Sequence, residues 1–250
     1  RNDDQEKTLA SRILALMAIT NPNYCASLTQ DFEDILEKSI KTKTEQPSNV
    51  PVEAVRAWGA LLFINADDNK TLLVLDKLLN ILTESENSSL QSAILETITL
   101  CVTTFSSEVI NHEIIPKYGP EIEALILSTE DWNLQVAASQ CLAVLFALFR
   151  EEHDSDEDLE NCVSVQQVVE YLESFASMKI LSLSNEEQKS VRNKFKESLR
   201  VITDDYCPEE ERSIENHKFT FDNWRKVTQI RWFADKLQGG LPSHSDSLVC

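Results

Sequence analysis

Apolar side chains recur every three or four residues along most of this chain, which is the spacing of an amphipathic α-helix. The clearest stripe runs from Leu134 through Leu142 to Phe149, and Asp131, just before it, is a suitable N-cap residue. The same spacing predicts helices at about residues 5–20, 28–40, 51–62, 72–82, 88–105, 119–127, 131–149 and 163–176.

Taken in pairs, these helices repeat at a regular interval. The first members begin near residues 5, 51, 88 and 131, a spacing of roughly 37–46 residues that is typical of HEAT and armadillo repeats. One pair cannot bury its apolar face alone, so neighbouring pairs stack around a continuous core. We predict an all-α, armadillo/HEAT-like helical-repeat solenoid that binds proteins through its surface. An ordinary helical bundle is the alternative.

The pattern changes after residue 184 and predicts a small C-terminal helical extension. Ser184 or Asn185 caps a long helix that ends near Thr203. Residues 204–216 are acidic and irregular, residues 219–221 alternate as a strand does, and a final helix covers about residues 223–238. Gly239 closes that helix.

Charge divides the chain at a similar point. The formal net charge is -19. Residues 1–178 hold 11 Lys/Arg and 30 Asp/Glu, a net of -19, whereas residues 179–250 hold 12 of each. We therefore predict two domains, an acidic repeat domain at 1–178 and a C-terminal region at 179–250. The acidic part repels nucleic acid, so any phosphate contact is expected in the last third.

The composition excludes several functions. Only 4 Gly occur, too few for nucleotide-binding or sheet-rich folds, and the motifs of common hydrolases, zinc proteases and P-loop proteins are absent. Asp154, Asp156 and Asp158 imitate the start of an EF-hand loop, but Leu159 and Val165 stand where it needs Gly and Glu. We expect a solvated acidic loop, and no enzyme activity, small-molecule substrate, metal or cofactor.

The environment of the protein is predicted from its cysteines and apolar runs. None of the 6 Cys forms a CxxC pair, so we expect reduced thiols and a cytoplasmic or nuclear location. An apolar run of membrane-spanning length and a signal peptide are both absent, and we expect no membrane association. The chain starts at Arg1 without Met, and we expect it to be truncated at both ends.

Two helices carry candidate binding residues. On the helix that follows Ser184, four cations form one stripe roughly opposite the apolar stripe: Lys189, Arg192, Lys196 and Arg200. They are predicted to contact phosphates or an acidic partner, the alternatives being a solvated face or ion pairs with the acidic repeats.

On the last helix, Arg225, Trp232 and Lys236 fall on the side away from the apolar stripe. An exposed Trp between cations predicts a contact hot spot. The alternative is packing against a further C-terminal segment. Trp224 is expected to attach this region to the solenoid.

Five features between residues 133 and 244 together suggest a known family. They are an aromatic segment ending in Trp (219–224), a glycine-containing turn followed by His (237–244), an apolar helix (133–146), the acidic loop after it, and a basic helix (188–196). In these features the chain resembles the interferon-related developmental regulator family. Ser245 follows His244 where the family usually has Leu, and the basic tail and the earliest repeat are missing. This suggests a divergent member, such as a fungal or other lower-eukaryote protein.

The resemblance implies an armadillo-like domain and two described roles: transcriptional co-regulation through histone deacetylase complexes, and binding to ribosomes that keeps them translationally inactive. We favour the ribosomal role, with the C-terminal third facing ribosomal RNA and the acidic repeats facing basic ribosomal proteins. A transcriptional co-regulator scaffold and a generic helical-repeat protein–protein adaptor are the alternatives.

Overall fold

The computed structural model describes residues 2–21, 33–41, 48–65, 67–151, 156–180, 182–214 and 217–237. Its residues form two compact units. The first contains Arg1–Thr104, Glu211–Thr220 and Gln229–Cys250, and the second contains Phe105–Glu210 and Phe221–Thr228. The two units are defined by contacts between residues, whereas the predicted boundary at residue 178 was drawn from the distribution of charge. The units therefore do not test that boundary.

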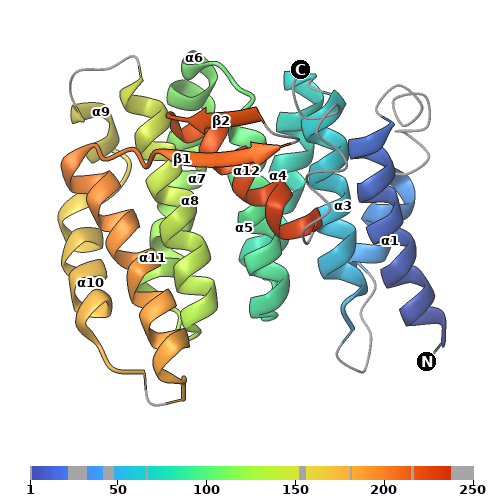
Figure 1. Ribbon diagram of the computed structural model, residues 1–250, viewed down its shortest axis with the longest axis horizontal. Helices are drawn as coiled ribbons and strands as arrows, with labels where there is room; N and C mark the ends of the chain where they lie inside the picture. Colours follow the sequence, from blue (N-terminus) through green and yellow to red (C-terminus); the bar gives the residue numbers. More distant parts are fainter. Residues whose placement is uncertain are drawn as a thin grey trace. The chain divides into compact units, whose positions relative to one another are not determined.

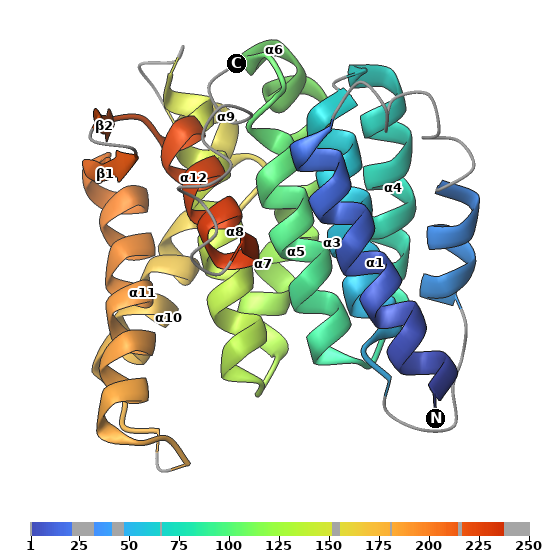
Figure 2. The same ribbon diagram turned by 45° about the vertical axis from the view of Figure 1, so that its right-hand side comes forward.

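The first unit consists mainly of helices arranged in two layers (Figures 1 and 2). Its helices are α1 (Asn2–Thr20), a helical segment at residues 33–41, α3 (Val50–Asn65), α4 (Asp68–Glu84) and α5 (Ser88–Val102). Helices α1, α3 and α5 pack side by side. The second layer holds α4 beside residues 33–41, joined by Lys70–Glu33 at 3.0 Å and Lys77–Glu37 at 2.8 Å.

The second unit continues the same type of packing. It contains α6 (Ser107–Val109), the π-helix η1 (Ile110–Ile114), α7 (Ile115–Ser128), α8 (Trp132–Arg150), α9 (Glu157–Glu160), α10 (Val165–Ser177) and α11 (Asn185–Asp204). Helix α8 packs against α7 and α11, and α10 packs against α11. The predicted helical-repeat solenoid is therefore confirmed.

Hydrogen bonds between residues one repeat apart show the periodicity directly. Several join positions 40 or 41 residues apart: Arg12 with Glu53, Arg56 with Glu96, Lys77 with Glu37, and the Ser164 amide with Glu123. The spacing lies within the predicted range. Equivalent positions of successive repeats therefore face each other, as a stacked array requires.

Local signals explain most helix boundaries. Asp131 caps α8 by accepting hydrogen bonds from the amides of Asn133 and Leu134, as predicted. Ser184, the first of the two predicted candidates, caps α11 in a capping box with Glu187. The sixth predicted helix begins earlier than expected, because the π-turn before Pro116 extends α7 backwards. The Ile115 amide bonds to the Ile110 carbonyl across that turn.

The C-terminal region forms two strands and a helix. Strand β2 (His217–Phe221) confirms the predicted short strand, and it pairs with β1 (Glu210–Ile214), which was expected to be irregular. Helix α12 (Trp224–Leu237) confirms the predicted last helix. Its first turn belongs to the second unit and its remainder to the first unit. Gly239 lies outside the described residues.

Two further findings concern apolar helices. Helix α8 has the length and hydropathy of a membrane-spanning helix, but 78% of its apolar window is buried, which is the pattern of a core helix. Helix α1 differs from expectation: its apolar stripe at Leu9, Ile13 and Leu16 is exposed, whereas Ala18 and Ile19 are buried.

Candidate partner-binding surface on α11

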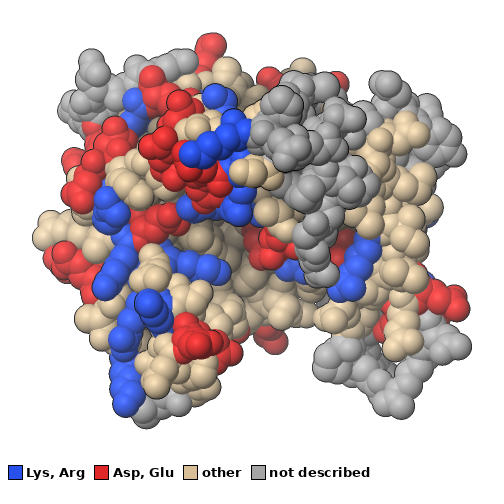
Figure 3. Space-filling view, viewed as in Figure 1, with Lys and Arg blue, Asp and Glu red and all other residues tan. Residues whose placement is uncertain are grey.

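Helix α11 is held in the second unit by its apolar side. Val191, Phe195 and Ile202 are buried, as the predicted stripe requires, although Leu199 is half-exposed. Phe195 contacts Phe175 of α10, with ring centroids 5.3 Å apart. The opposite side of α11 faces solvent, and Figure 3 shows Lys and Arg side chains along it.

The four predicted cations of this side are not equivalent. Lys189 and Lys196 are exposed, and neither forms an ion pair with any residue that the structure describes. Arg192 is half-buried, and its Nε donates to the Met178 carbonyl at 3.0 Å. Arg200 is exposed, with its guanidinium 3.6 Å from the centre of the Tyr206 ring. We define Lys189, Lys196 and Arg200 as the basic face of α11.

Arg150 of α8 fixes the C-terminal end of α11. Its Nη1 donates to the Val201 carbonyl at 2.8 Å, and its Nη2 donates to the Ile202 carbonyl at 2.9 Å. Its Nε donates to Asp156 at 2.8 Å, and this hydrogen bond raises the pKa of the guanidinium. Asp156, predicted to lie in a solvated loop, is therefore an ion-pair partner. Sequence periodicity carries no signal for this contact.

The start of α12 is tied to the second unit. Trp224 is buried, and its Nε1 donates to the Tyr206 carbonyl at 2.9 Å. Arg225 pairs with Glu151 at 2.7 Å and donates through Nη1 to the Phe105 carbonyl at 2.6 Å. The predicted binding residue Arg225 is thus occupied by contacts within its own unit, and Trp224 has the attaching role expected of it.

Trp232, predicted to be exposed, lies in the interior of its unit. Its side chain is buried, with 7% exposed, and it packs edge-on against Phe233. Phe233 in turn contacts Phe63 of α3, with ring centroids 5.2 Å apart. The expected exposure of Trp232 is therefore wrong, because α12 buries a wider face than its single apolar stripe indicated. The side chain of Lys236 lies outside the described part of the structure.

The described titratable side chains and cysteines were also compared with the requirements of a metal site. In the part of the chain that the structure describes, His, Cys, Asp and Glu side chains form no cluster of three or more able to hold a metal. Cys101 and Cys141 are buried and form no disulfide, and burial raises the pKa of the Cys101 thiol to about 12. Such a thiol stays protonated and unreactive at neutral pH.

The fold defines the class of this protein, an all-α helical-repeat solenoid. The family model of the interferon-related developmental regulators (IFRD) matches residues 1–203, and the chain belongs to this family. The family is regulatory and non-enzymatic and implies a role in gene expression. The predicted resemblance is confirmed, but the match ends before the aromatic segment at 219–224 that helped to suggest it.

Two curated proteins show the same relationship. Interferon-related developmental regulator 1 of Rattus norvegicus is 28% identical over 119 residues, which is 48% of this chain and 26% of the relative. The protein of that name from Sus scrofa is 28% identical over 122 residues, 49% of this chain and 26% of the relative. The matched segment thus spans about a quarter of each relative.

Proposed function

We propose that this protein is a ribosome-associated regulator that keeps ribosomes translationally inactive and contacts ribosomal RNA through α11. The observation that carries the proposal is the basic face of α11, which is exposed on a helix whose other side is buried. Family membership supports the coarser role in gene expression.

The spacing of the basic face suits a nucleic-acid backbone. Lys189 and Lys196 are seven residues apart, about two helical turns or roughly 10 Å along the axis. Because neither is engaged by a described carboxylate, both ammonium groups are available to neutralise phosphates and release counterions. The Arg200 guanidinium is held over the Tyr206 ring, so Arg200 loses less conformational entropy on binding than a mobile side chain does.

The acidic repeats complement this surface. Residues 1–178 carry a net formal charge of -19. This charge opposes RNA contact along the repeats and favours the basic proteins that accompany RNA in a ribosome. The two charge regions would therefore set the orientation of the protein on its target.

Ribosome co-sedimentation across a salt series tests the proposal. The wild-type chain is compared with Lys189→Glu/Lys196→Glu and with Lys41→Glu/Lys218→Glu. The control makes the same charge change at two exposed lysines whose surface ion pairs contribute little to stability. We expect wild type and control to pellet with ribosomes and to lose binding as salt rises, and the α11 variant to pellet at least about ten-fold less.

The outcomes separate the candidate functions. Equal pelleting of the two variants would exclude the basic face as the contact. If the wild-type chain fails to pellet even at low salt, the ribosomal role is wrong, and binding to histone deacetylase complexes becomes the next assay. Repression is tested separately, as reduced translation in a cell-free system on adding wild type but not the α11 variant.

A further inference from the structure

Helix α1 presents an apolar face that none of the residues described by the structure covers. Leu9, Ile13 and Leu16 are 58%, 47% and 40% exposed, and their spacing of four and three places them on one side of the helix. Figure 3 shows an uncharged surface along α1, with acidic atoms near its N-terminal end. We call these three residues the α1 stripe. Contiguous exposed apolar residues of this kind mark interaction sites.

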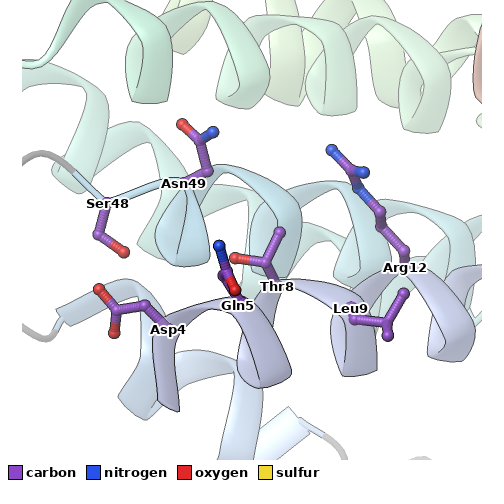
Figure 4. A pocket seen from close by; sticks show the side chains of 7 residues that line it. All are labelled: Asp4, Gln5, Thr8, Leu9, Arg12, Ser48 and Asn49. Atoms are coloured by element: carbon purple, nitrogen blue, oxygen red, sulfur yellow. The ribbon is translucent and has the colours of Figure 1, made fainter. Parts of the chain in front are cut away.

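A groove runs beside the α1 stripe. It has a volume of about 390 Å³ and lies between α1 and the start of α3, lined by Asp4, Gln5, Thr8, Leu9, Arg12, Ser48 and Asn49. Figure 4 shows Asp4 at one end of this row and Arg12 at the other. Arg12 is bound to Glu53 at 3.2 Å. Leu9 belongs to both features, so stripe and groove form one continuous surface.

The charge around this surface is negative. Asp3 is paired with Lys7 at 2.8 Å, but Asp4 and Glu6 form no ion pair with any described residue. Both carboxylates lie on the first two turns of α1, next to the apolar part of the surface. A partner that covers the α1 stripe therefore binds most favourably if it places a cation beside Asp4 and Glu6.

We propose that the α1 stripe and its groove dock an amphipathic helix of a protein partner, whose leucine-type side chains cover Leu9, Ile13 and Leu16 and whose Lys or Arg contacts Asp4 and Glu6. Residues spaced four and three apart are the pattern of helix-in-groove recognition. A second copy of this chain is disfavoured because each copy carries a formal charge of -19. The inference does not depend on ribosome binding.

Binding of two synthetic peptides tests the proposal. Each is an alanine-based helix of about 20 residues with leucines at intervals of three and four, flanked by lysines in one peptide and by glutamates in the other. Fluorescence anisotropy measures their affinity for the 250-residue chain. We expect the lysine peptide to bind at least about ten-fold more tightly than the glutamate peptide.

Variants identify the surface. Leu9→Ser/Ile13→Ser/Leu16→Ser should abolish binding of the lysine peptide without altering the circular dichroism spectrum, because all three side chains are exposed. Leu73→Ser is the matched control, since Leu73 is 67% exposed on α4, and it should bind as wild type does. Asp4→Asn/Glu6→Gln should remove most of the preference for lysine over glutamate.

Three results would overturn the proposal. The first is equal affinity for the two peptides, or binding to neither. The second is undiminished binding by the triple variant. The third is a dimer in light scattering that the triple variant dissociates, which would assign the α1 stripe to a second copy.

Discussion

Arg56 of α3 reaches Glu96 of α5 at 3.2 Å, across 40 residues of sequence, and also holds Glu53 at 3.2 Å within its own helix. Arg12 of α1 adds a second cation to Glu53. The four side chains form a ladder across three successive helices of one layer. Glu53 is its most buried member, and it therefore depends most on its partners.

The ladder predicts a pH dependence of stability. Burial alone would raise the pKa of Glu53, but hydrogen bonds and attraction from Arg12 and Arg56 outweigh it and hold the pKa below its usual value. Because the folded-state pKa is the lower one, the carboxylate stabilises the fold above the unfolded-state pKa of about 4.3. This stabilisation is lost as the pH falls through the folded-state pKa.

We expect Glu53→Gln to lower the free energy of unfolding at pH 7 by about 1–3 kcal/mol, because Arg12 and Arg56 lose their shared acceptor. Urea unfolding of both proteins between pH 7 and pH 3 checks this, and the difference should shrink toward the acid end. A difference that stays constant to pH 3 would contradict the assigned role of the carboxylate.

The close approach of α3 and α5 predicts a second effect. A Cβ atom on Gly59 would lie 2.8 Å from Cγ2 of Thr97, a fully buried and β-branched side chain. We expect Gly59→Ala to destabilise by about 1–3 kcal/mol, in spite of the better helix propensity of Ala. Thermal unfolding of the wild type and the variant measures this loss of stability. Thr97→Ser removes the clashing methyl group, so the double variant should recover part of the loss, whereas additive losses would argue against the contact.

Arg150 predicts a local effect at one end of α11. Arg150→Met removes its hydrogen bonds to the Val201 and Ile202 carbonyls and to Asp156. We expect a loss of about 2–3 kcal/mol and faster amide hydrogen exchange in the last turn of α11. The first turn keeps its capping box and should exchange as before. Arg192→Met is the control, since Arg192 contacts the Met178 carbonyl near the other end. Uniformly faster exchange along α11 would mean that Arg150 stabilises the whole unit instead.

The sequence predicted what depends on neighbouring residues and missed what depends on distant ones. The caps at Asp131 and Ser184 were predictable because capping uses residues two or three positions apart. The contacts of Arg150 with Val201 and Ile202 lie more than 50 residues apart, so no local pattern reveals them. Periodicity likewise identifies an apolar stripe but does not show whether another element covers it. The exposure of the α1 stripe therefore could not be predicted from the sequence.

The burial of Trp232 predicts that this side chain stabilises the fold and does not contact the ribosome. Trp232 was expected to be an exposed contact, but it is buried beside Phe233, which packs on Phe63. We expect Trp232→Ala to cost about 3–5 kcal/mol, as loss of a large core side chain does. Ribosome pelleting measured well below the melting temperature of the variant should be unchanged, because the indole faces the interior. A core residue cannot be removed without a loss of stability. If the variant fails to pellet but its circular dichroism spectrum and melting curve match those of the wild type, Trp232 is a binding residue instead.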